Sequence, residues 1–251
     1  MDYYSSLKRL IDSDIECHYF DSLESTSSFL NSLPSSTLTQ LCVTREQTQG
    51  KGQHGREWLS QKDGSILFSI RQTFGIDINL SGLSLVVGLA IIKALEKECK
   101  VDGFKIKWPN DIYFRDAKLA GILLENNIHK GSQSIIIGVG LNYHIKQEIS
   151  CDIPWTDLSK IDKKLPDIHE LTASIINNIL SMSTYFKLNG LSSLISQWNQ
   201  YDMLKGVKLK SIEFGRSFEG EVLGISDQGA LKVLTKNGTK ELYSSKNIEY
   251  I

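Results

Sequence analysis

The sequence predicts an α+β protein in two parts, a body of helices and strands followed by a small all-β barrel. One long stretch, residues 81–100, has apolar residues at helical spacing, whereas the short apolar runs around it have the composition of β-strands. From about Val207 onward the chain changes to short strands with tight turns. A hydrophobic content of 41% with only 4 prolines in 251 residues supports a buried core and excludes a disordered chain.

Before the long helix, short helices and strands alternate. They are expected as helices at residues 3–11 and 25–33 and strands at residues 18–20, 38–44 and 65–72. Ser25 and Thr26 carry side chains that cap helix N-termini, and Pro34 cannot continue a helix, so these residues bound the second helix. Residues 47–63, rich in glycine and charge, form the connection between the last two strands.

After the long helix, the sequence predicts strands at residues 104–108, 111–114, 119–125 and 133–139 and helices at residues 167–187 and 190–200. Beyond them, D-Q-G ending at Gly229 and K-N-G ending at Gly238 are hairpin turn sequences. About fifty residues of β-structure make a barrel that has to dock on the body to be stable. The boundary falls between Tyr201 and Gly206, which divides the chain into domains 1–202 and 203–251.

Charge and cysteine usage exclude several classes of protein. With 28 Lys+Arg against 29 Asp+Glu the net charge is −1, so the chain lacks the overall excess of basic residues that is typical of nucleic-acid-binding proteins, and no nucleic-acid partner is expected. The cysteines are far apart, at Cys17, Cys42, Cys99 and Cys151, and no C-x-x-C pair suggests zinc or redox chemistry. The first six residues lack a signal-peptide pattern, and the longest apolar stretch, residues 83–95, is too short to cross a membrane. A cytoplasmic protein without a membrane partner is expected.

Residues 50–58, G-K-G-Q-H-G-R-E-W, match the dinucleotide fingerprint G-x-G-x-x-G. That fingerprint requires a helix directly after the glycines, and a strand follows here, so the Rossmann interpretation fails; a Walker loop fails because Arg56 and Glu57 replace Lys-Ser/Thr. Three glycines still allow backbone N–H groups to converge on an anion, and Lys51 and Arg56 add positive charge. Taken alone, the segment is equally compatible with a flexible hairpin connection.

A second cluster places two cations, an amide and a carboxylate at strand ends, at Lys107, Asn110, Asp111 and Lys118. A plain hairpin with surface lysines is the alternative. A third segment, residues 135–142, is a buried strand that ends in G-V-G-L-N. In isolation, its two glycines indicate close backbone packing within a sheet.

In this order and spacing, these segments resemble the biotin protein ligases. The family pattern has Ser-Thr-Asn, then G-R-G-R-x-G-R-x-W, K-W-P-N-D, K-x-x-G-I-L and G-x-G-x-N. The matching positions are residues 25–27, 50–58, 107–111, 118–123 and 138–142. The resemblance implies a mixed-sheet biotin/lipoate ligase catalytic domain with helices packed on it, followed by an SH3-like C-terminal barrel.

The resemblance also implies an ATP-dependent biotin–[biotin carboxyl-carrier protein] ligase. The biotin carboxylate attacks the α-phosphorus of ATP, which gives biotinyl-5′-adenylate and pyrophosphate. A lysine of a biotin carboxyl carrier domain, from acetyl-CoA carboxylase or another biotin-dependent carboxylase, then attacks the adenylate and releases AMP. Both nucleophiles belong to the substrates, so the protein has to supply cations and backbone donors. Mg²⁺ is expected to be held mainly by the ATP phosphates. The resemblance leaves open whether two chains form a homodimer.

Matching positions give each expected site residue a role. Biotin is expected to contact Ser25, Thr26, Ser27, Gln47, Gly50, Lys51, Gly52, Gln53, Lys118 and Gly121. ATP is expected to contact Arg56, Trp58, Lys107, Asn110, Lys118 and Asn142, with Trp58 packing over adenine. The catalytic residues are expected to be Lys118, between the carboxylate and the α-phosphate, Arg56 on phosphate, and Asp111 on the incoming lysine.

The chain departs from the family pattern at a few positions. Ser27 stands in place of an asparagine, Lys51 and Gln53 replace loop arginines, and residues 248–251 read I-E-Y-I where many relatives have Ser-Leu-Arg. Twenty-four residues before Ser25 are too few for the winged helix of bifunctional members, so a monofunctional ligase is expected. The alternatives are a lipoate ligase or octanoyltransferase, which lack K-W-P-N-D, and a non-catalytic biotin sensor.

Overall fold

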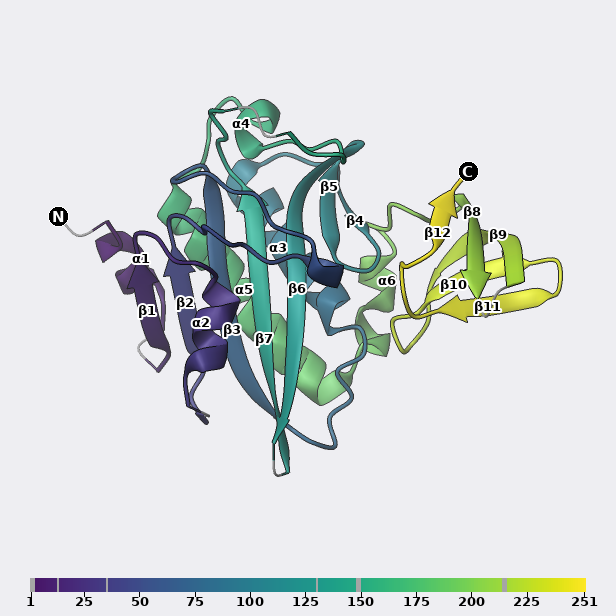
Figure 1. The fold of residues 1–251 in the computed structure, drawn as a ribbon, viewed down its shortest axis with the longest axis horizontal. Helices are drawn as coiled ribbons and strands as arrows, with labels where there is room; N and C mark the ends of the chain where they lie inside the picture. Colours follow the sequence, from purple (N-terminus) through teal and green to yellow (C-terminus); the bar gives the residue numbers. More distant parts are fainter. Residues whose placement is uncertain (1–2, 13, 35, 130, 148–149, 214–215) are drawn as a thin grey trace.

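The structure, a computed structural model, describes residues 3–12, 14–34, 36–129, 131–147, 150–213 and 216–251. Its strands form one seven-stranded sheet, ordered β1-β2-β3-β7-β6-β5-β4, and one five-stranded sheet, ordered β11-β10-β9-β8-β12. The larger sheet makes the body, and the smaller one lies beyond its β4 edge (Figure 1). The α+β fold class is thereby confirmed.

The larger sheet is mixed, as expected. Its strands are β1 (Glu16–Phe20), β2 (Gln40–Thr44), β3 (Ser65–Gly75), β4 (Phe104–Lys107), β5 (Asp111–Phe114), β6 (Ala117–His129) and β7 (Ser132–Asn142). The β1–β2 pair is parallel and every other neighbouring pair is antiparallel. The long β3–β7–β6 ladder forms the centre of the sheet, and β6 and β7 bear two of the predicted motifs, at residues 118–123 and 138–142.

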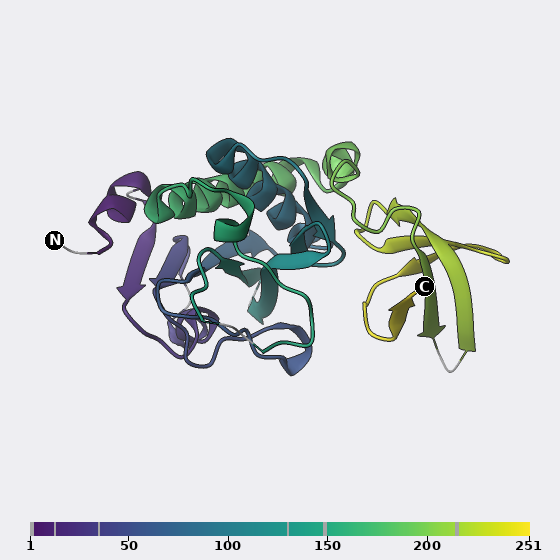
Figure 2. The same ribbon diagram turned by 90° about the horizontal axis from the view of Figure 1, so that it is seen from above.

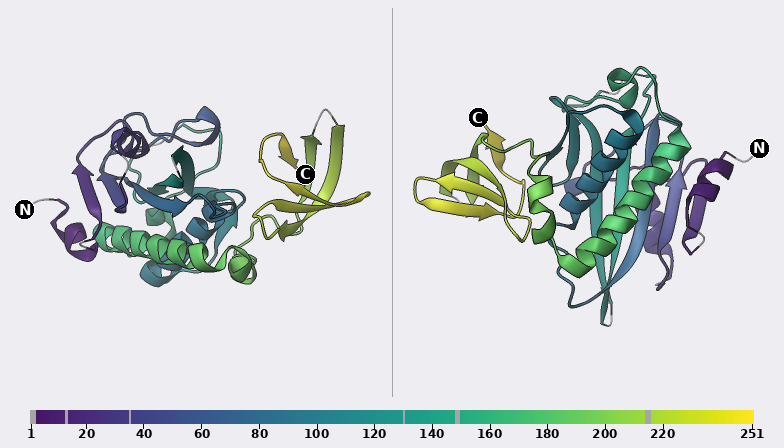
Figure 3. Two further views of the ribbon diagram at one scale, coloured as in Figure 1. Left: turned by 90° about the horizontal axis from the view of Figure 1, so that it is seen from below. Right: turned by 180° about the vertical axis from the view of Figure 1, so that it is seen from behind.

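The two long helices cover one face of this sheet, and the short helix α2 lies with long connections on the other. The helices are α1 (Ser5–Leu10), α2 (Thr26–Ser32), α3 (Leu83–Cys99), α4 (Leu158–Ile161), α5 (Ile168–Asn189) and α6 (Ile195–Trp198). Figures 2 and 3 show α3 and α5 side by side across one face, with α2 and long connections on the opposite face. Leu85, Leu89, Ile92 and Leu95 of α3 are at most 1% exposed, so the predicted apolar stripe faces the core.

The five-stranded antiparallel sheet comprises β8 (Lys208–Glu213), β9 (Arg216–Ile225), β10 (Leu231–Thr235), β11 (Gly238–Leu242) and β12 (Ile248–Tyr250). Both predicted hairpin turns lie where expected, on either side of β10. The first turn docks on the body: Trp108 Nε1 donates to the Gly229 carbonyl at 2.9 Å, and Asn79 Nδ2 donates to Gln228 Oε1 at 2.6 Å. The division into domains 1–202 and 203–251 stays a prediction.

Two helical features differ from the sequence prediction. The helix expected at residues 190–200 is shorter and less regular than predicted, because a 3₁₀ turn at Ser192–Leu194 leads into the four-residue α6. The serines explain the difference, since the Ser193 hydroxyl donates to the Gly190 carbonyl at 3.0 Å and competes with helical bonding. The short helix α4 was not anticipated. No helix among the described residues is long and apolar enough to span a membrane.

Candidate active site

A pocket of about 640 Å³ is lined in part by the start of α2 and the β2–β3 connection, which lie on the sheet face opposite α3 and α5. Its walls come from the start of α2, the connection between β2 and β3, strands β4 to β7, and the C-terminal segment 245–250. All but one of the predicted site residues line it: Ser25, Thr26, Ser27, Gln47, Lys51, Gly52, Gln53, Arg56, Trp58, Lys107, Asn110, Asp111, Lys118, Gly121 and Asn142. Gly50 lies behind this lining, where its backbone carbonyl accepts from Trp58 N–H at 2.9 Å.

One end of the pocket is a network of uncharged polar groups. Ser25 caps α2, with its hydroxyl accepting from Ser28 N–H at 3.4 Å, which confirms the predicted cap. Gln47 Oε1 accepts from Thr26 N–H at 2.8 Å and from the Thr26 hydroxyl at 3.1 Å. The Thr26 and Ser69 hydroxyl oxygens are 2.7 Å apart. Because the Thr26 hydrogen is directed to Gln47, Ser69 has to donate to Thr26.

This chain of hydrogen bonds fixes which groups a ligand would meet. The Gln47 carbonyl oxygen is occupied, so its NH₂ group is left to donate, while the Thr26 and Ser69 oxygens offer lone pairs. Ser69, fully buried in β3, was missed by the sequence analysis. The available signal was a serine within the apolar run Leu67 to Ile70 of a central strand.

The other end of α2 is held by a buried arginine from the same strand as Ser69. The Arg71 guanidinium donates to the carbonyls of Leu30 at 2.7 Å and Leu33 at 3.2 Å, and to that of Pro34. These carbonyls lie at the C-terminal end of α2, where helical bonding runs out; the Leu30 carbonyl accepts in addition from Leu33 N–H at 3.2 Å. Arg71 therefore fixes the position of the helix whose first turn lines the pocket.

The glycine loop is a compact hairpin. Gly52 N–H donates to the Arg56 carbonyl at 2.8 Å, and the backbones of Lys51 and Glu57 form an isolated antiparallel β-bridge across the loop. A 3₁₀ turn at Gln53–Gly55 closes it, with no long helix following, which agrees with the rejection of a Rossmann motif. Within the part of the chain that the structure describes, Lys51 and Arg56 make no side-chain hydrogen bond or ion pair, so both remain available to an anion.

The Trp58 indole lies flat on the sheet between two motif glycines. A Cβ atom on Gly140 would overlap the indole, and one on Gly121 would lie 3.0 Å from its Cζ3 atom. The close packing expected for the G-V-G segment therefore exists at Gly140, but its partner is a side chain from the glycine loop. Lys118 Nζ lies 5.6 Å from the same ring.

A cluster of charges occupies the middle of the pocket. Lys118 Nζ lies 2.8 Å from Asp111 Oδ1, and both side chains are about one-fifth exposed, at 21% and 20%. Lys107 Nζ lies 5.3 Å from the Tyr113 ring centre and 4.7 Å from that of Tyr250. Burial lowers the pKa of Lys107, and Asp111 opposes this shift while Lys118 adds to it. Burial and the Asp111 charge raise the pKa of both tyrosines to about 12, so both rings are neutral at physiological pH.

Two asparagines use their amide hydrogens within the protein. Asn110 Nδ2 donates to the Ile122 carbonyl at 2.7 Å, and Asn142 Nδ2 donates to the Thr156 carbonyl at 3.0 Å. Both side chains are buried. Each side chain keeps its oxygen and one amide hydrogen for the nucleotide contacts that the sequence predicts.

Residues 150–157 form a wall of the pocket that the sequence analysis missed. Lys118 N–H donates to the Pro154 carbonyl and Thr156 N–H to the Lys118 carbonyl, both at 2.9 Å, so the segment pairs with the backbone of Lys118 itself. It also brings Cys151, Ile153 and Trp155 to the pocket.

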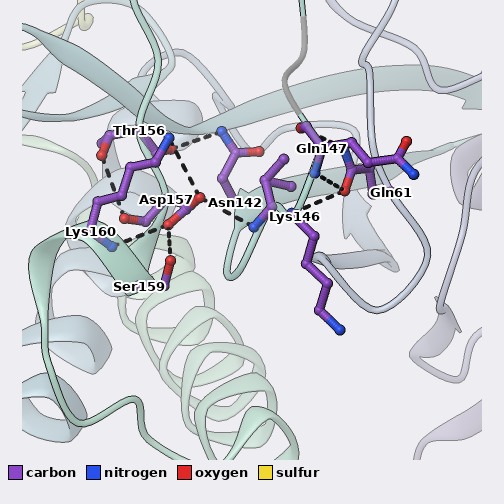
Figure 4. A network of polar contacts seen from close by, with 9 residues as sticks. Gln61, Asn142, Lys146, Gln147, Thr156, Asp157, Ser159 and Lys160 are labelled. Atoms are coloured by element: carbon purple, nitrogen blue, oxygen red, sulfur yellow. Dashed lines mark hydrogen bonds and ion pairs between the residues drawn. The ribbon is translucent and has the colours of Figure 1, made fainter.

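This wall is anchored by a fully buried carboxylate (Figure 4). Asp157 accepts from Ile145 N–H at 3.2 Å, from the Ser159 hydroxyl at 2.5 Å and from Lys160 N–H at 3.2 Å. Residues 146 and 147, which precede this wall, are linked to the β2–β3 connection through Gln61. The Gln61 Oε1 accepts from the N–H groups of both residues, each at 3.1 Å. The available sequence signal for this cap was the aspartate itself, a residue type that favours helix N-caps.

Taken as a whole, the pocket suits an anionic ligand with one uncharged polar end. Five basic residues line it, Lys51, Arg56, Lys107, Lys118 and Lys246, against two acidic ones, Glu57 and Asp111. The described residues contain no group of three or more His, Cys, Asp or Glu side chains that could hold a metal ion.

The fold is that of the biotin/lipoate ligase class. Residues 19–142 match the Biotin/lipoate A/B protein ligase family, and residues 205–246 match the Biotin protein ligase C terminal domain. The similar solved structures include a biotin protein ligase from Aquifex aeolicus in complex with biotin and ATP, with a TM-score of 0.79 and 29% identity over 94% of this chain and 98% of that one.

Among characterised relatives, the Escherichia coli bifunctional ligase/repressor BirA is 32% identical over 76% of this chain, and the match spans 60% of that protein's length. The biotin–[acetyl-CoA-carboxylase] ligase of Mycobacterium tuberculosis is 27% identical over 75% of this chain and 71% of its own. The chain belongs to the biotin protein ligase family.

Proposed function

We propose that the protein activates biotin with ATP as biotinyl-5′-adenylate and transfers it to a lysine of a biotin carboxyl carrier domain, releasing pyrophosphate and AMP. One observation carries the proposal: a single pocket joins an uncharged polar network at α2 to a cationic centre at Lys118. Biotin has the same two-ended character, with a neutral urea group at one end and a carboxylate at the other. The relatives in this family support the same reaction.

At the neutral end, the direction of the hydrogen bonds matches a urea. The Gln47 NH₂ group would donate to the ureido oxygen, and the Thr26 and Ser69 oxygens would accept from its N–H groups. Ser25, Ser27 and the backbone at Gly52 complete this wall, and Gln53 and Gly121 lie further along the pocket. A buried urea needs each polar group paired, which is what excludes an apolar ring system of the same size.

At the cationic end, the basic side chains would hold two anions together. Lys118 would lie between the biotin carboxylate and the α-phosphate, Arg56 and Lys107 would contact the phosphates, and Trp58 would pack against adenine. Mg²⁺ would enter with the ATP phosphates and neutralise part of their charge. Asp111, already 2.8 Å from Lys118, would receive the carrier lysine after adenylation.

The test is to incubate the full chain with biotin, Mg·ATP and a biotin carboxyl carrier domain, and to follow pyrophosphate release and carrier biotinylation. Parallel reactions contain lipoate or octanoate with a lipoyl domain. We expect pyrophosphate release and carrier biotinylation in the reactions that contain biotin, and neither pyrophosphate release nor label in those that contain lipoate or octanoate. Label on the lipoyl domain would favour the lipoate ligase alternative, and biotin binding without pyrophosphate release would favour a sensor.

A further inference from the structure

The last strand of the smaller sheet delivers an aromatic ring to the charged centre of the pocket. Tyr250 is the final residue of β12, where it pairs with Leu209 of β8, and the next residue, Ile251, donates its N–H to the Lys208 carbonyl at 2.9 Å. The backbone on both sides of the ring is therefore held by the five-stranded sheet. The ring itself lines the pocket with residues of the body.

There the ring faces a half-buried cation. Lys107 Nζ lies 4.7 Å from the Tyr250 ring centre and 5.3 Å from that of Tyr113, so the ammonium group has an aromatic ring from each of the two sheets. The negative face of a neutral aromatic ring attracts a cation, and the attraction grows when the cation is withdrawn from water. Lys107 extends from β4, next to Asp111 and Lys118, where its ammonium can reach a ligand phosphate.

We propose that Tyr250 is a positioning residue: it holds the Lys107 ammonium in the pocket, and through this contact the C-terminal sheet sets the affinity for the ATP phosphates. The proposal rests on the proposed function, because it assigns Lys107 to the nucleotide. Biotin binds at the opposite, uncharged end and should be insensitive to Tyr250.

The first experiment measures KM for Mg·ATP and for biotin by pyrophosphate release, in the wild type and in Tyr250→Leu, Tyr250→Phe and Tyr243→Leu. Tyr243 is the control, a tyrosine directly after β11 that is 70% exposed and does not line the pocket. We expect Tyr250→Leu to raise KM for ATP about 2- to 30-fold, the range of one cation–π contact, with kcat and KM for biotin unchanged. Tyr250→Phe should restore the wild-type value. Equal rises in both KM values, or no rise, would overturn the proposal.

A double-mutant cycle tests whether Tyr250 acts through Lys107. Lys107→Met alone should raise KM for ATP, and adding Tyr250→Leu should raise it no further. Additive effects would show that Tyr250 acts on ATP by another route.

If Tyr250→Leu lowers the melting temperature below that of the assay, a trifluorinated phenylalanine in place of Tyr250 keeps the shape and weakens the ring's attraction for cations. KM for ATP should then rise relative to Tyr250→Phe, and an unchanged value would contradict the proposal. Absence of biotin-dependent pyrophosphate release in the wild type would instead reject the proposed function.

Discussion

Lys118 is the side chain on which the chemistry should depend most. It pairs with Asp111 at 2.8 Å, and its own backbone is clamped by residues 154 and 156. We expect Lys118→Ala to reduce biotin-dependent pyrophosphate release on the order of 10²–10³-fold, the usual effect of losing one electrostatic donor in an enclosed site. Lys97→Ala is the control, because Lys97 is 74% exposed on α3. A Lys118→Ala rate above about a third of wild type, a loss well under 1 kcal/mol, would remove Lys118 from its proposed role.

Ser69 offers a second test at the scale of one atom. Ser69→Ala removes the hydrogen that Thr26 accepts and one lone pair offered to the urea. We expect KM for biotin to rise about 2- to 12-fold, corresponding to about 0.5–1.5 kcal/mol for one neutral hydrogen bond, with KM for ATP unchanged. Ser65→Ala is the matched control: Ser65 is buried in the same strand, and its hydroxyl has no hydrogen-bond partner among the described residues. Identical KM values for biotin in the two variants would argue against the Ser69 contact.

At this scale, sequence reasoning located the residues that belong to recognisable motifs and missed those that do not. Lys107, Lys118 and Trp58 stand in patterns whose spacing is visible along the chain. Ser69 and Tyr250 reach the pocket only because long-range packing places β3 and β12 there. Ser69 contacts Thr26, 43 residues away in the chain, and Tyr250 contacts Lys107, 143 residues away (250 − 107). No local pattern encodes such a meeting.

Among the elements, prediction succeeded where apolar spacing is regular. The α3 helix and strand β5 fall where expected, and β6 and β7 run beyond their predicted ends. Strand β6 extends through Asn126 and Asn127, beyond the apolar core, because its hydrogen-bonded ladder to β7 keeps it regular there without apolar alternation. Residues 150–157 show neither the helical nor the strand-like spacing of apolar residues, so the sequence did not predict that they lie beside Lys118.

The 150–157 wall can be tested through its anchor. Asp157 and Asp167 both cap helices, but Asp157 is fully buried and also binds Ile145 N–H, whereas Asp167 caps the exposed start of α5. Asp167→Ala should cost about 1 kcal/mol of unfolding free energy, and Asp157→Ala about 2–4 kcal/mol because buried donors lose their partner.

Measured well below both melting temperatures, only Asp157→Ala should lower kcat for pyrophosphate release, since the wall it anchors pairs with Lys118. Denaturant melts establish the stability difference, and initial rates establish the effect on catalysis. Equal rates in the two variants would show that the wall does not support the site.

On the scale of the whole molecule, the smaller sheet meets the body at a contact between two glycines, one in the turn before β10 and one at the start of α3. Gly229, in the turn before β10, has φ +74° and lies so close to Gly82 that an added Cβ would be 2.7 Å from the Gly82 Cα. Gly238, with φ +106°, has open space around it. Alanine at either position carries the strain of a left-handed conformation, about 1–2 kcal/mol, but only at Gly229 does it also push the smaller sheet away from the body.

Gly229→Ala should therefore raise KM for ATP by moving Tyr250 away from Lys107, and Gly238→Ala should lower stability alone. Steady-state kinetics with both variants, together with their melting curves, separate the two effects. The same KM for ATP in both would mean that the contact between the smaller sheet and the body does not govern nucleotide affinity.

The placement of Trp58 against Gly121 and Gly140 has an optical consequence. Of the 4 tryptophans, Trp58, Trp108 and Trp155 line the pocket, although Trp108 is only 3% exposed, whereas Trp198 is 1% exposed in the core. Indole emission responds to polarity and to nearby charge, so Trp198 supplies a constant background and the tryptophans at the pocket report its occupancy. Titrations of biotin and of ATP can therefore be followed in the unlabelled protein, and Trp58→Phe would assign the signal to the glycine loop.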